Sequence, residues 1–468
     1  MSGTDSAHTR QVKQLIALIG DHRSKPQTLL NDAKAYFEAS KDNEASLAAV
    51  QSDIANAEDN DINAFESKLK SLKRDIDNER LERLSRVNDV ISNLMKLSEG
   101  QSEEETLEQS AKSLGTIFLI SDAASNQLAN VHQTLKPAYK AILSLRLCDA
   151  ILKSGSLKHG YLSQYTESHS RFSGNRHWQE KWLTGIARPL IKAAMFQDIG
   201  LQHPQAQKIL YGIDNNKDPF RVLDEQERKQ LLKLNYHYTL DYIKNGLGLP
   251  GYVGNSKAER DKFYAEEQDA LDFCTEVIAE AFTAKHNVGE LIKIPQIYAS
   301  FVLSTKQGYN RAELPKGYMV IEQLAKNGKL NPKMAEYFLA LVGYFPQGFG
   351  ISYIPFDDTG TARDIYEYAI VNRLCPASPA EPQCRAVTRH LSFIRSGKDL
   401  IVKKHQNLYF QSNHKKLIHT SEARLKEIRA QLSSQLSIEE DETTIPRFWE
   451  PSDYFADKKH QNLWNKLS

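Results

Sequence analysis

The feature that most constrains this chain is the absence of proline between Pro26 and Pro137, a span that contains only two glycines, Gly100 and Gly115. Proline and glycine are the residues that most strongly disfavour a helix interior. The span is also rich in Ala, Glu, Lys, Leu and Ser, several of which are good helix formers. It therefore predicts long helices, with Ser102 and Glu105 at capping-box spacing for a new helix.

Apolar residues within this span follow the alternating three- and four-residue spacing of a coiled coil. They fall into two groups that are one residue out of register: Ile62, Phe65, Leu69, Leu72 and Ile76, then Leu84, Val87, Ile91 and Leu94. The shift makes the apolar seam drift around the helix. The pattern predicts either a coiled coil that joins two copies of the chain or a helix hairpin or bundle that packs on itself.

The rest of the chain predicts a mainly α protein with a small β element. Apolar residues keep the helical period from about residue 143 to 345, and Asp224 with Glu227 marks a helix start. After Gly350, short segments rich in Val, Ile and Tyr predict strands within 351–356, 368–372, 386–393 and 398–410. The predicted domains are a helical or coiled-coil region over 1–142, a helical domain over 143–350, a β-rich extension over 351–415, and a C-terminal tail over 416–468 with one helix at 423–436.

Composition limits the classes of function. A chain of 468 residues is too long for one ordinary core, so it predicts several domains. Its 60 basic and 59 acidic residues argue against a nucleic-acid polymer as partner and against a polybasic membrane anchor. Apolar runs are too short for membrane insertion, and the N-terminus lacks a secretory pattern. Four widely spaced cysteines fit a reducing compartment, so we expect a cytoplasmic protein: Cys148, Cys274, Cys375 and Cys384.

The segment with the most chemical information is 192–200, which reads KAAMFQDIG. A helix that ends in Asp-Ile-Gly resembles the metal-binding helix of the HD superfamily of phosphohydrolases. Four further segments resemble the helices that follow it in bacterial HD-GYP proteins, in the same order: 223–243, 279–287, 297–311 and 330–350, the last ending in Tyr344, Phe345, Pro346 and Gly348. The resemblance covers about residues 143–410, so the helical domain over 143–350 is similar to an HD-GYP domain.

The resemblance implies a site for cyclic di-GMP or a related cyclic dinucleotide. Members of the family hydrolyse these compounds with two or three bound metals, commonly iron. A metal screens the negative phosphodiester and supplies a bound hydroxide near neutral pH. Such a centre needs a dense set of His, Asp and Glu ligands around an open coordination position.

This sequence keeps few of those ligands. Asp198 is retained, but its histidine partner is replaced by Gln197, and the next histidine position falls on Asn235 with His237 two residues away. His286 is the one imidazole of the triplet Lys285–Asn287, and the GYP tripeptide is missing.

Two histidines, His159 and His169, are candidates for the first ligand, and the resemblance leaves the choice open. A dinuclear centre would need extra carboxylates, for which Glu266, Glu267 and Glu276 are the nearest candidates. We therefore expect no bound metal, or one at most. An active enzyme of this family would use iron or manganese.

A protein that has lost its metals could still bind a cyclic dinucleotide. Its phosphates require cations, and its bases stack on flat side chains. The segments that border the family pocket offer such groups at Lys285, Lys306, Tyr309 and Arg311. The structural alternative is a solvated basic face with a packed tyrosine.

Three hypotheses for function follow. The first is a catalytically inactive HD-GYP-like signalling or scaffold protein that binds a cyclic dinucleotide or a protein partner. The second is a metal-dependent phosphohydrolase, such as a cyclic di-GMP phosphodiesterase, with a rearranged ligand set. The third is a structural assembly protein that forms a homodimer through its N-terminal coiled coil.

Overall fold

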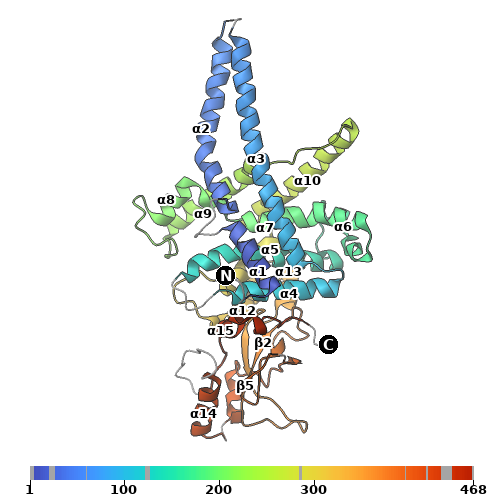
Figure 1. Ribbon diagram of the computed structural model, residues 1–468, viewed down its shortest axis with the longest axis vertical. Helices are drawn as coiled ribbons and strands as arrows, with labels where there is room; N and C mark the ends of the chain where they lie inside the picture. The colour runs from blue at the N-terminus through green and yellow to red at the C-terminus, as the bar shows by residue number, and fades with distance from the viewer. Residues whose placement is uncertain are drawn as a thin grey trace. The chain divides into compact units, whose positions relative to one another are not determined.

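The protein is mainly helical with a small antiparallel sheet, which confirms the predicted mainly α class (Figure 1). The computed structural model describes residues 5–20, 27–58, 61–121, 127–283, 287–395, 397–417, 420–433 and 445–465. In the described part of the chain, no helix combines the length and the apolar character that crossing a membrane requires.

The chain divides into two compact units, each built from separate stretches of sequence. The first unit comprises Met1–Gln14, Leu94–Ser156 and Lys293–Ser468, and the second comprises Leu15–Asn93 and Leu157–Ile292. The domain boundaries predicted at residues 142, 350 and 415, and the HD-GYP-like character of the middle region, stay predictions.

Within the described residues, the helices lie in stretches for which the sequence predicts helix, except α15, because the sequence predicts only one helix in the tail over 416–468. They are α1 (Ala7–Ile19), α2 (Leu29–Asn56), α3 (Ile62–Ser98), α4 (Glu103–Leu119), α5 (Leu128–Ser154), α6 (Arg176–Trp182), α7 (Arg188–Phe196), α8 (Pro204–Tyr211), α9 (Glu225–Asp241), α10 (Lys257–Ala281), α11 (Glu290–Val302), α12 (Lys316–Lys326), α13 (Pro332–Val342), α14 (Glu422–Ser433) and α15 (Ser452–Ala456).

Two predicted helix starts are confirmed by their side-chain caps. The Ser102 hydroxyl accepts a hydrogen bond from the Glu105 backbone N–H at 3.1 Å. The Asp224 carboxylate likewise accepts one from the Glu227 backbone N–H at 2.8 Å. Each cap satisfies a backbone donor that has no partner within its own helix, which fixes where α4 and α9 begin.

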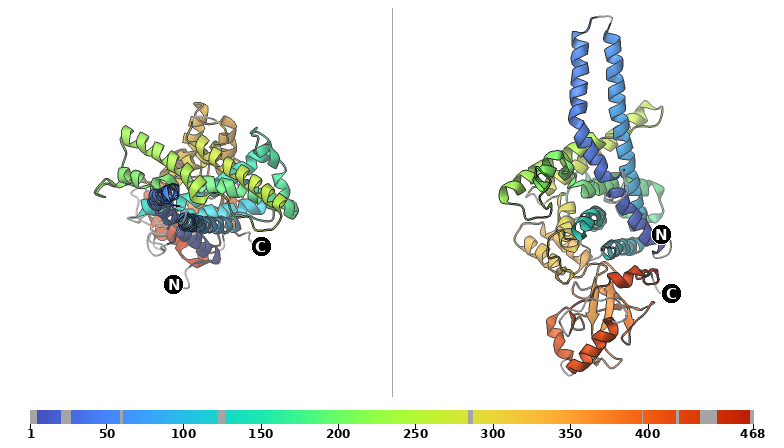
Figure 2. Two further views of the ribbon diagram at one scale, coloured as in Figure 1. Left: turned by 90° about the horizontal axis from the view of Figure 1, so that it is seen from above. Right: turned by 60° about the vertical axis from the view of Figure 1, so that its left-hand side comes forward.

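In the second unit, α2 and α3 lie side by side as a long helix hairpin (Figures 1 and 2). The Arg86 guanidinium on α3 pairs with the Asp32 carboxylate on α2 at 2.7 Å. The predicted seam on α3 is partly buried at Phe65 and Leu69 and buried at Leu84. The hairpin within one chain, which was one of the two alternatives, is therefore present.

The sheet lies in the first unit. Within the described residues, a four-stranded antiparallel sheet has the order β1 (Gly350–Tyr353), β2 (Glu367–Val371), β3 (Gln383–Ala386) and β6 (Asp399–Ile401). Its register pairs Ile351 with Ala369, and Cys384 with both Val371 and Leu400. A second pair joins β4 (Thr388–Arg389) to β5 (Ser392–Phe393).

Two predicted strand segments differ from the structure, each for a local reason. The segment 386–393 contains a hairpin, because His390 and Leu391 both have positive φ and turn the chain between β4 and β5. The segment 398–410 holds only the short strand β6, because the chain turns at Lys403, whose carbonyl accepts a hydrogen bond from the Gln406 N–H at 2.8 Å.

The glycine of the Asp-Ile-Gly tripeptide has a packing role in the second unit. Gly200 lies in the 3-10 turn η4 (Ile199–Gln202), against which α9 packs. Its N–H donates to the Thr239 hydroxyl at 3.0 Å. A Cβ at residue 200 would lie 2.4 Å from the Asn235 carbonyl oxygen and 2.8 Å from the Thr239 nitrogen. The close approach of two backbones therefore requires glycine here.

We expect Gly200→Ala to lower the free energy of unfolding by about 1–3 kcal/mol, because backbone atoms must shift to admit the methyl group. Urea denaturation followed by circular dichroism measures the change. Gly160→Ala is the matched control, since nothing lies within 4 Å of a Cβ at that position. Equal stability of the two variants would contradict the packing role.

Candidate functional site

Asp198, the retained residue of the predicted metal site, lies between α7 and η4. The Asn235 side-chain amide approaches the Asp198 carboxylate and the Gln197 carbonyl, each at 3.4 Å. Asn235 is buried at the position where the family resemblance expects a histidine. The carboxylate of Asp198 thus meets an amide donor from α9.

The three candidate histidines that the structure describes differ in their surroundings. The imidazole of His159 pairs with the Glu276 carboxylate, with 3.3 Å between Nε2 and Oε2, so the structure brings together two residues from the predicted set. His169 lies exposed in the 3-10 turn η2 (Ser168–Ser173), and His237 lies exposed on α9 with its ring against Tyr238.

His286 and Lys285 lie outside the described residues. Of the additional carboxylates, Glu266 pairs with Lys262 on the surface of α10 at 3.8 Å, and Glu267 lines a pocket described below. In the described part of the chain, His, Cys, Asp and Glu side chains form no group of three or more suited to a metal ion.

The predicted ligand-binding residues that the structure describes lie in the first unit, whereas the described metal candidates lie in the second. Lys306 is exposed. The Tyr309 hydroxyl donates to the Val302 carbonyl at 2.6 Å, and burial raises the pKa of this phenol to about 12.

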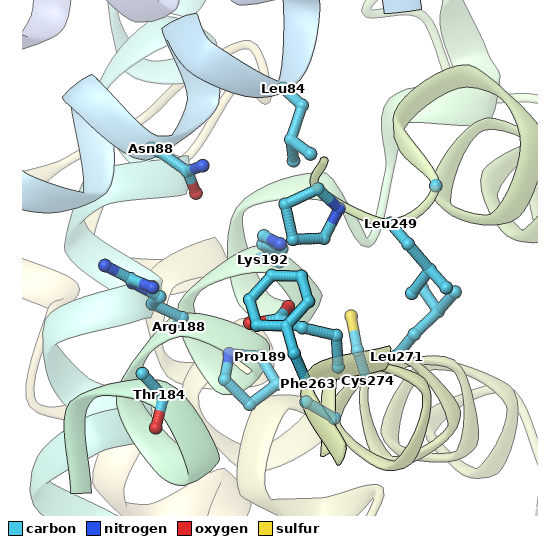
Figure 3. A pocket seen from close by; sticks show the side chains of 14 residues that line it. Leu84, Asn88, Thr184, Arg188, Pro189, Lys192, Leu249, Phe263, Leu271 and Cys274 are labelled. Carbon is cyan, nitrogen blue, oxygen red and sulfur yellow. The ribbon is translucent and has the colours of Figure 1, made fainter. Parts of the chain in front are cut away.

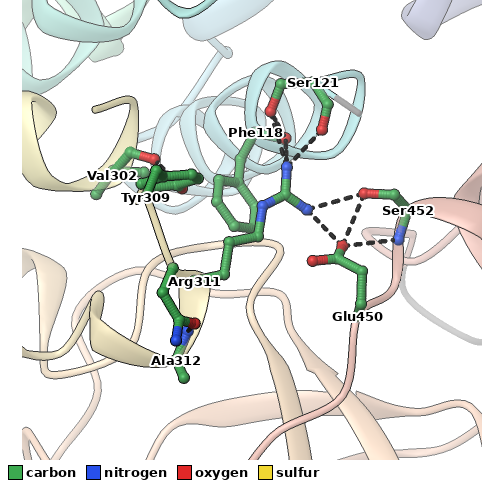
Figure 4. A network of polar contacts seen from close by, with 9 residues as sticks. Phe118, Ser121, Val302, Tyr309, Arg311, Ala312, Glu450 and Ser452 are labelled. Atoms are coloured by element: carbon green, nitrogen blue, oxygen red, sulfur yellow. Dashed lines mark hydrogen bonds and ion pairs between the residues drawn. The ribbon is translucent and has the colours of Figure 1, made fainter. Parts of the chain in front are cut away.

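Arg311 is the centre of a buried polar network (Figure 4). One terminal nitrogen of its guanidinium donates to the Glu450 carboxylate and, at 2.8 Å, to the Ser452 hydroxyl. The other donates to the backbone carbonyls of Phe118 and Ser121 and to the Ser121 hydroxyl. Arg311 thereby joins α4, the turn after α11 and the C-terminal residues around α15.

A pocket of about 120 Å³ lies within the second unit. Its walls come from α3, from the start of α7, from the loop after the π-helical turn η5 (Tyr242–Leu247), and from α10. The lining residues are Leu84, Asn88, Thr184, Arg188, Pro189, Lys192, Gly248, Leu249, Pro250, Phe263, Glu267, Ala270, Leu271 and Cys274. The walls are thus mainly apolar, with a few polar groups that converge on one space.

Two π-helical turns border this pocket. One is η3 (Leu183–Ala187), which runs into α7, and the other is η5. π-Helical turns are rare and are often found at functional sites, because the wider turn changes where side chains and carbonyls point. Here η3 contributes Thr184 and leads directly into Arg188.

Arginines from α3 hold the loop that follows η5. The Arg80 guanidinium donates to the carbonyls of Leu247 and Leu249 at 2.8 and 2.6 Å, and Arg83 donates to the Gly246 carbonyl at 3.1 Å. These bonds satisfy carbonyls at the end of a helical turn, where no helical N–H follows. Gly248 has φ +58°, so it permits the reversal that brings Leu249 into the pocket wall.

The charges in the pocket come mainly from one helix. Arg188 and Lys192 are one turn apart on α7, and Figure 3 shows them on one side of the pocket, with Leu249 and Leu271 opposite. Both are half-buried. Among the residues that the structure describes, neither side chain makes a hydrogen bond or an ion pair. Glu267 on α10 is the acidic residue of the pocket.

Burial shifts the pKa of two pocket residues. It lowers the pKa of the Lys192 amine, an effect that neighbouring Cys274 and Glu267 partly oppose and Arg188 strengthens. It raises the pKa of the Cys274 thiol to about 12, although Lys192 acts in the opposite direction. At neutral pH the pocket therefore contains a neutral thiol beside an amine that loses its proton more readily than an exposed lysine does.

Arg188 and Lys192 were not predicted as site residues from the sequence. The sequence pattern that could have identified them is a lysine within the apolar run Leu190–Phe196, four residues after an arginine. A cation on the buried side of such a helix indicates either an ion pair or a ligand.

No family model, curated protein or solved structure matches this chain. The resemblance to HD-GYP proteins therefore stays a prediction that rests on the motifs named above.

We expect Arg311→Ala to lower the free energy of unfolding by at least 2 kcal/mol, because it leaves a carboxylate and several carbonyls without their donor (about 3–5 kcal/mol for a fully buried pair). Guanidinium denaturation measures the loss. Lys306→Ala, on an exposed side chain of the same segment, should change stability by less than about 0.5 kcal/mol. A loss in Arg311→Ala no larger than that in Lys306→Ala would contradict the structural role of Arg311.

Proposed function

We propose that this chain is a catalytically inactive, HD-GYP-like signalling or scaffold protein whose second unit binds a small organic anion. The observation that carries the proposal is the pair Arg188 and Lys192, which line one pocket and make no hydrogen bond or ion pair to a described residue. The proposal assigns no metal to this pocket.

Without a ligand, the two positive charges of Arg188 and Lys192 destabilise the fold in two ways. Like charges four residues apart destabilise a helix by a few tenths of a kcal/mol, and removing a cation from water without a partner costs more. An anion bound between the two side chains would accept charge-assisted hydrogen bonds from both. These bonds would offset the repulsion between the charges and the cost of removing them from water. Glu267 could accept a hydrogen bond from a hydroxyl or amino group of the same ligand.

The pocket also indicates the size and shape of the ligand. Its volume of about 120 Å³ is below the roughly 300–1,000 Å³ of sites for drug-sized ligands. A compact carboxylate or phosphate with a short apolar part fits this space better than a whole cyclic dinucleotide does. Leu84, Leu249 and Phe263 would cover the apolar part.

Isothermal titration calorimetry with a panel of short carboxylates, phosphate monoesters and cyclic di-GMP tests the proposal. We expect at least one compact anion to bind, and Lys192→Met and Arg188→Met each to weaken binding about tenfold or more, since a hydrogen bond to a charged group contributes roughly 1.5–3 kcal/mol.

Lys229→Met and Lys233→Met are the matched controls, because these two lysines are also four residues apart but lie exposed on α9. They should leave binding unchanged. Failure of the whole panel, or equal loss in the α9 variants, would refute the proposal.

A structural assembly role is the second candidate, and the α2–α3 hairpin favours it. Phe65 and Leu69 remain partly exposed on α3, although both belong to the apolar seam that the sequence spacing identifies. A second copy of the hairpin could cover these side chains as in a four-helix bundle.

We expect wild-type protein to form dimers in analytical ultracentrifugation and Leu69→Lys to shift it toward monomer, because a charge in the seam costs more in the dimer than in the partly exposed monomer. Lys70→Glu, on the exposed side of α3, should have no such effect. A wild-type monomer at all accessible concentrations would eliminate this candidate.

A further inference from the structure

The pocket contains an amine that is placed for chemistry as well as for charge. We propose that Lys192 forms a reversible imine with an anionic ligand that carries an aldehyde or ketone group. This inference rests on the proposed function, because it concerns the same pocket and names the class of ligand.

The first support is the availability of the amine. Lys192 lines the pocket and, in the part of the chain that the structure describes, makes no hydrogen bond or ion pair. Only the neutral amine attacks a carbonyl carbon, and burial lowers its pKa, which increases the neutral fraction at a given pH.

The second support is the inertness of the neighbouring thiol. Cys274 also lines the pocket, and a thiolate would compete for the same carbonyl. Burial holds the pKa of this thiol at about 12, so the protonated form dominates at neutral pH. The pocket thus favours the amine over the thiol as nucleophile.

The third support is the arrangement of charges around the amine. Side chains one helical turn apart have Cβ atoms about 5–6 Å from each other, so Arg188 and Lys192 can contact neighbouring groups of one small molecule. The Arg188 guanidinium can donate two parallel hydrogen bonds to the acid group of the ligand. The ligand class is therefore a compact anion with a carbonyl close to its acid group, such as a 2-oxo acid or a short aldehyde phosphate.

The reaction needs no further reagent. The nitrogen lone pair of Lys192 forms a bond to the carbonyl carbon, and the C=O π electrons move to oxygen. The nitrogen gives up a proton while the oxygen takes one, which yields a carbinolamine. Loss of that hydroxyl as water, with a second proton, leaves the imine. Glu267, the carboxylate of the pocket, is available to carry these protons.

The test uses the 468-residue chain and glyoxylate, the smallest 2-oxo acid, with sodium cyanoborohydride to reduce any imine to a stable carboxymethyl amine. Peptide mapping by mass spectrometry locates the modified lysines. We expect modification of Lys192 at least tenfold above that of Lys229 and Lys233, which are exposed. Lys192→Arg should abolish the preferred adduct, and Arg188→Met should slow its formation.

Glycolate, which has the acid group but no carbonyl, separates this inference from the proposed function. If glycolate binds in calorimetry and protects Lys192 but glyoxylate gives no preferred adduct, the imine is refuted while anion binding stands. If neither compound binds and labelling follows exposure alone, both are refuted. Circular dichroism melting curves of each variant confirm that it is folded, and a competitor-sensitive adduct in wild-type protein supports the imine without any variant.

Discussion

A charge that leaves water needs a partner, and this constraint governs how the fold is joined together. In the first unit, buried Arg146 pairs with Glu99 and Asp149, and buried Arg311 pairs with Glu450. Buried Arg385 pairs with Asp399 at 2.7 Å. Arg146 and Asp149 lie on the same helix, α5, whereas the pairs with Glu99, Glu450 and Asp399 each join two segments of the chain. In each pair the opposite charges offset the cost of leaving water. Arg188 and Lys192 in the second unit depart from this rule, since neither makes a hydrogen bond or an ion pair to a described residue, although Glu267 opposes the lowering of the Lys192 pKa.

The surrounding helices hold the shape of the pocket that contains these two cations. The hairpin helix α3 supplies one wall of the pocket and, through Arg80 and Arg83, holds the carbonyls at the end of η5. The turn η3 leads into the helix that carries both cations. The pocket is therefore built on packed helices rather than on a free loop, which suits a site that must hold a small ligand in one orientation.

The sequence predicts the local structure well because the forces involved are local. The proline-free span, the caps at Ser102 and Asp224, and the apolar periodicity each act within a few residues, and each is confirmed. The division into two discontinuous units depends on contacts such as Arg311 with Phe118, which are 193 residues apart. Helical spacing carries no information about such pairs.

The candidate site was harder to predict, again for a physical reason. Motif comparison led to Asp198 and the histidines, whose place in a metal site depends on ligands brought together from several helices. Lys192 is the first residue of the segment 192–200 that suggested the resemblance. However, the packing of α3 and α10 decides whether its side chain meets a partner, solvent or a pocket. The resemblance to HD-GYP proteins and the cytoplasmic location stay predictions.

The most direct measurement of the central claim is the unfolding free energy of Lys192→Met without ligand, compared with Arg86→Met, whose wild-type side chain is paired with Asp32. If the charge at residue 192 serves a ligand rather than the fold, its removal should leave stability unchanged or raise it by about 1 kcal/mol, while Arg86→Met should lower it. A loss of more than about 1 kcal/mol in Lys192→Met would show that the ammonium stabilises the fold and would contradict the account.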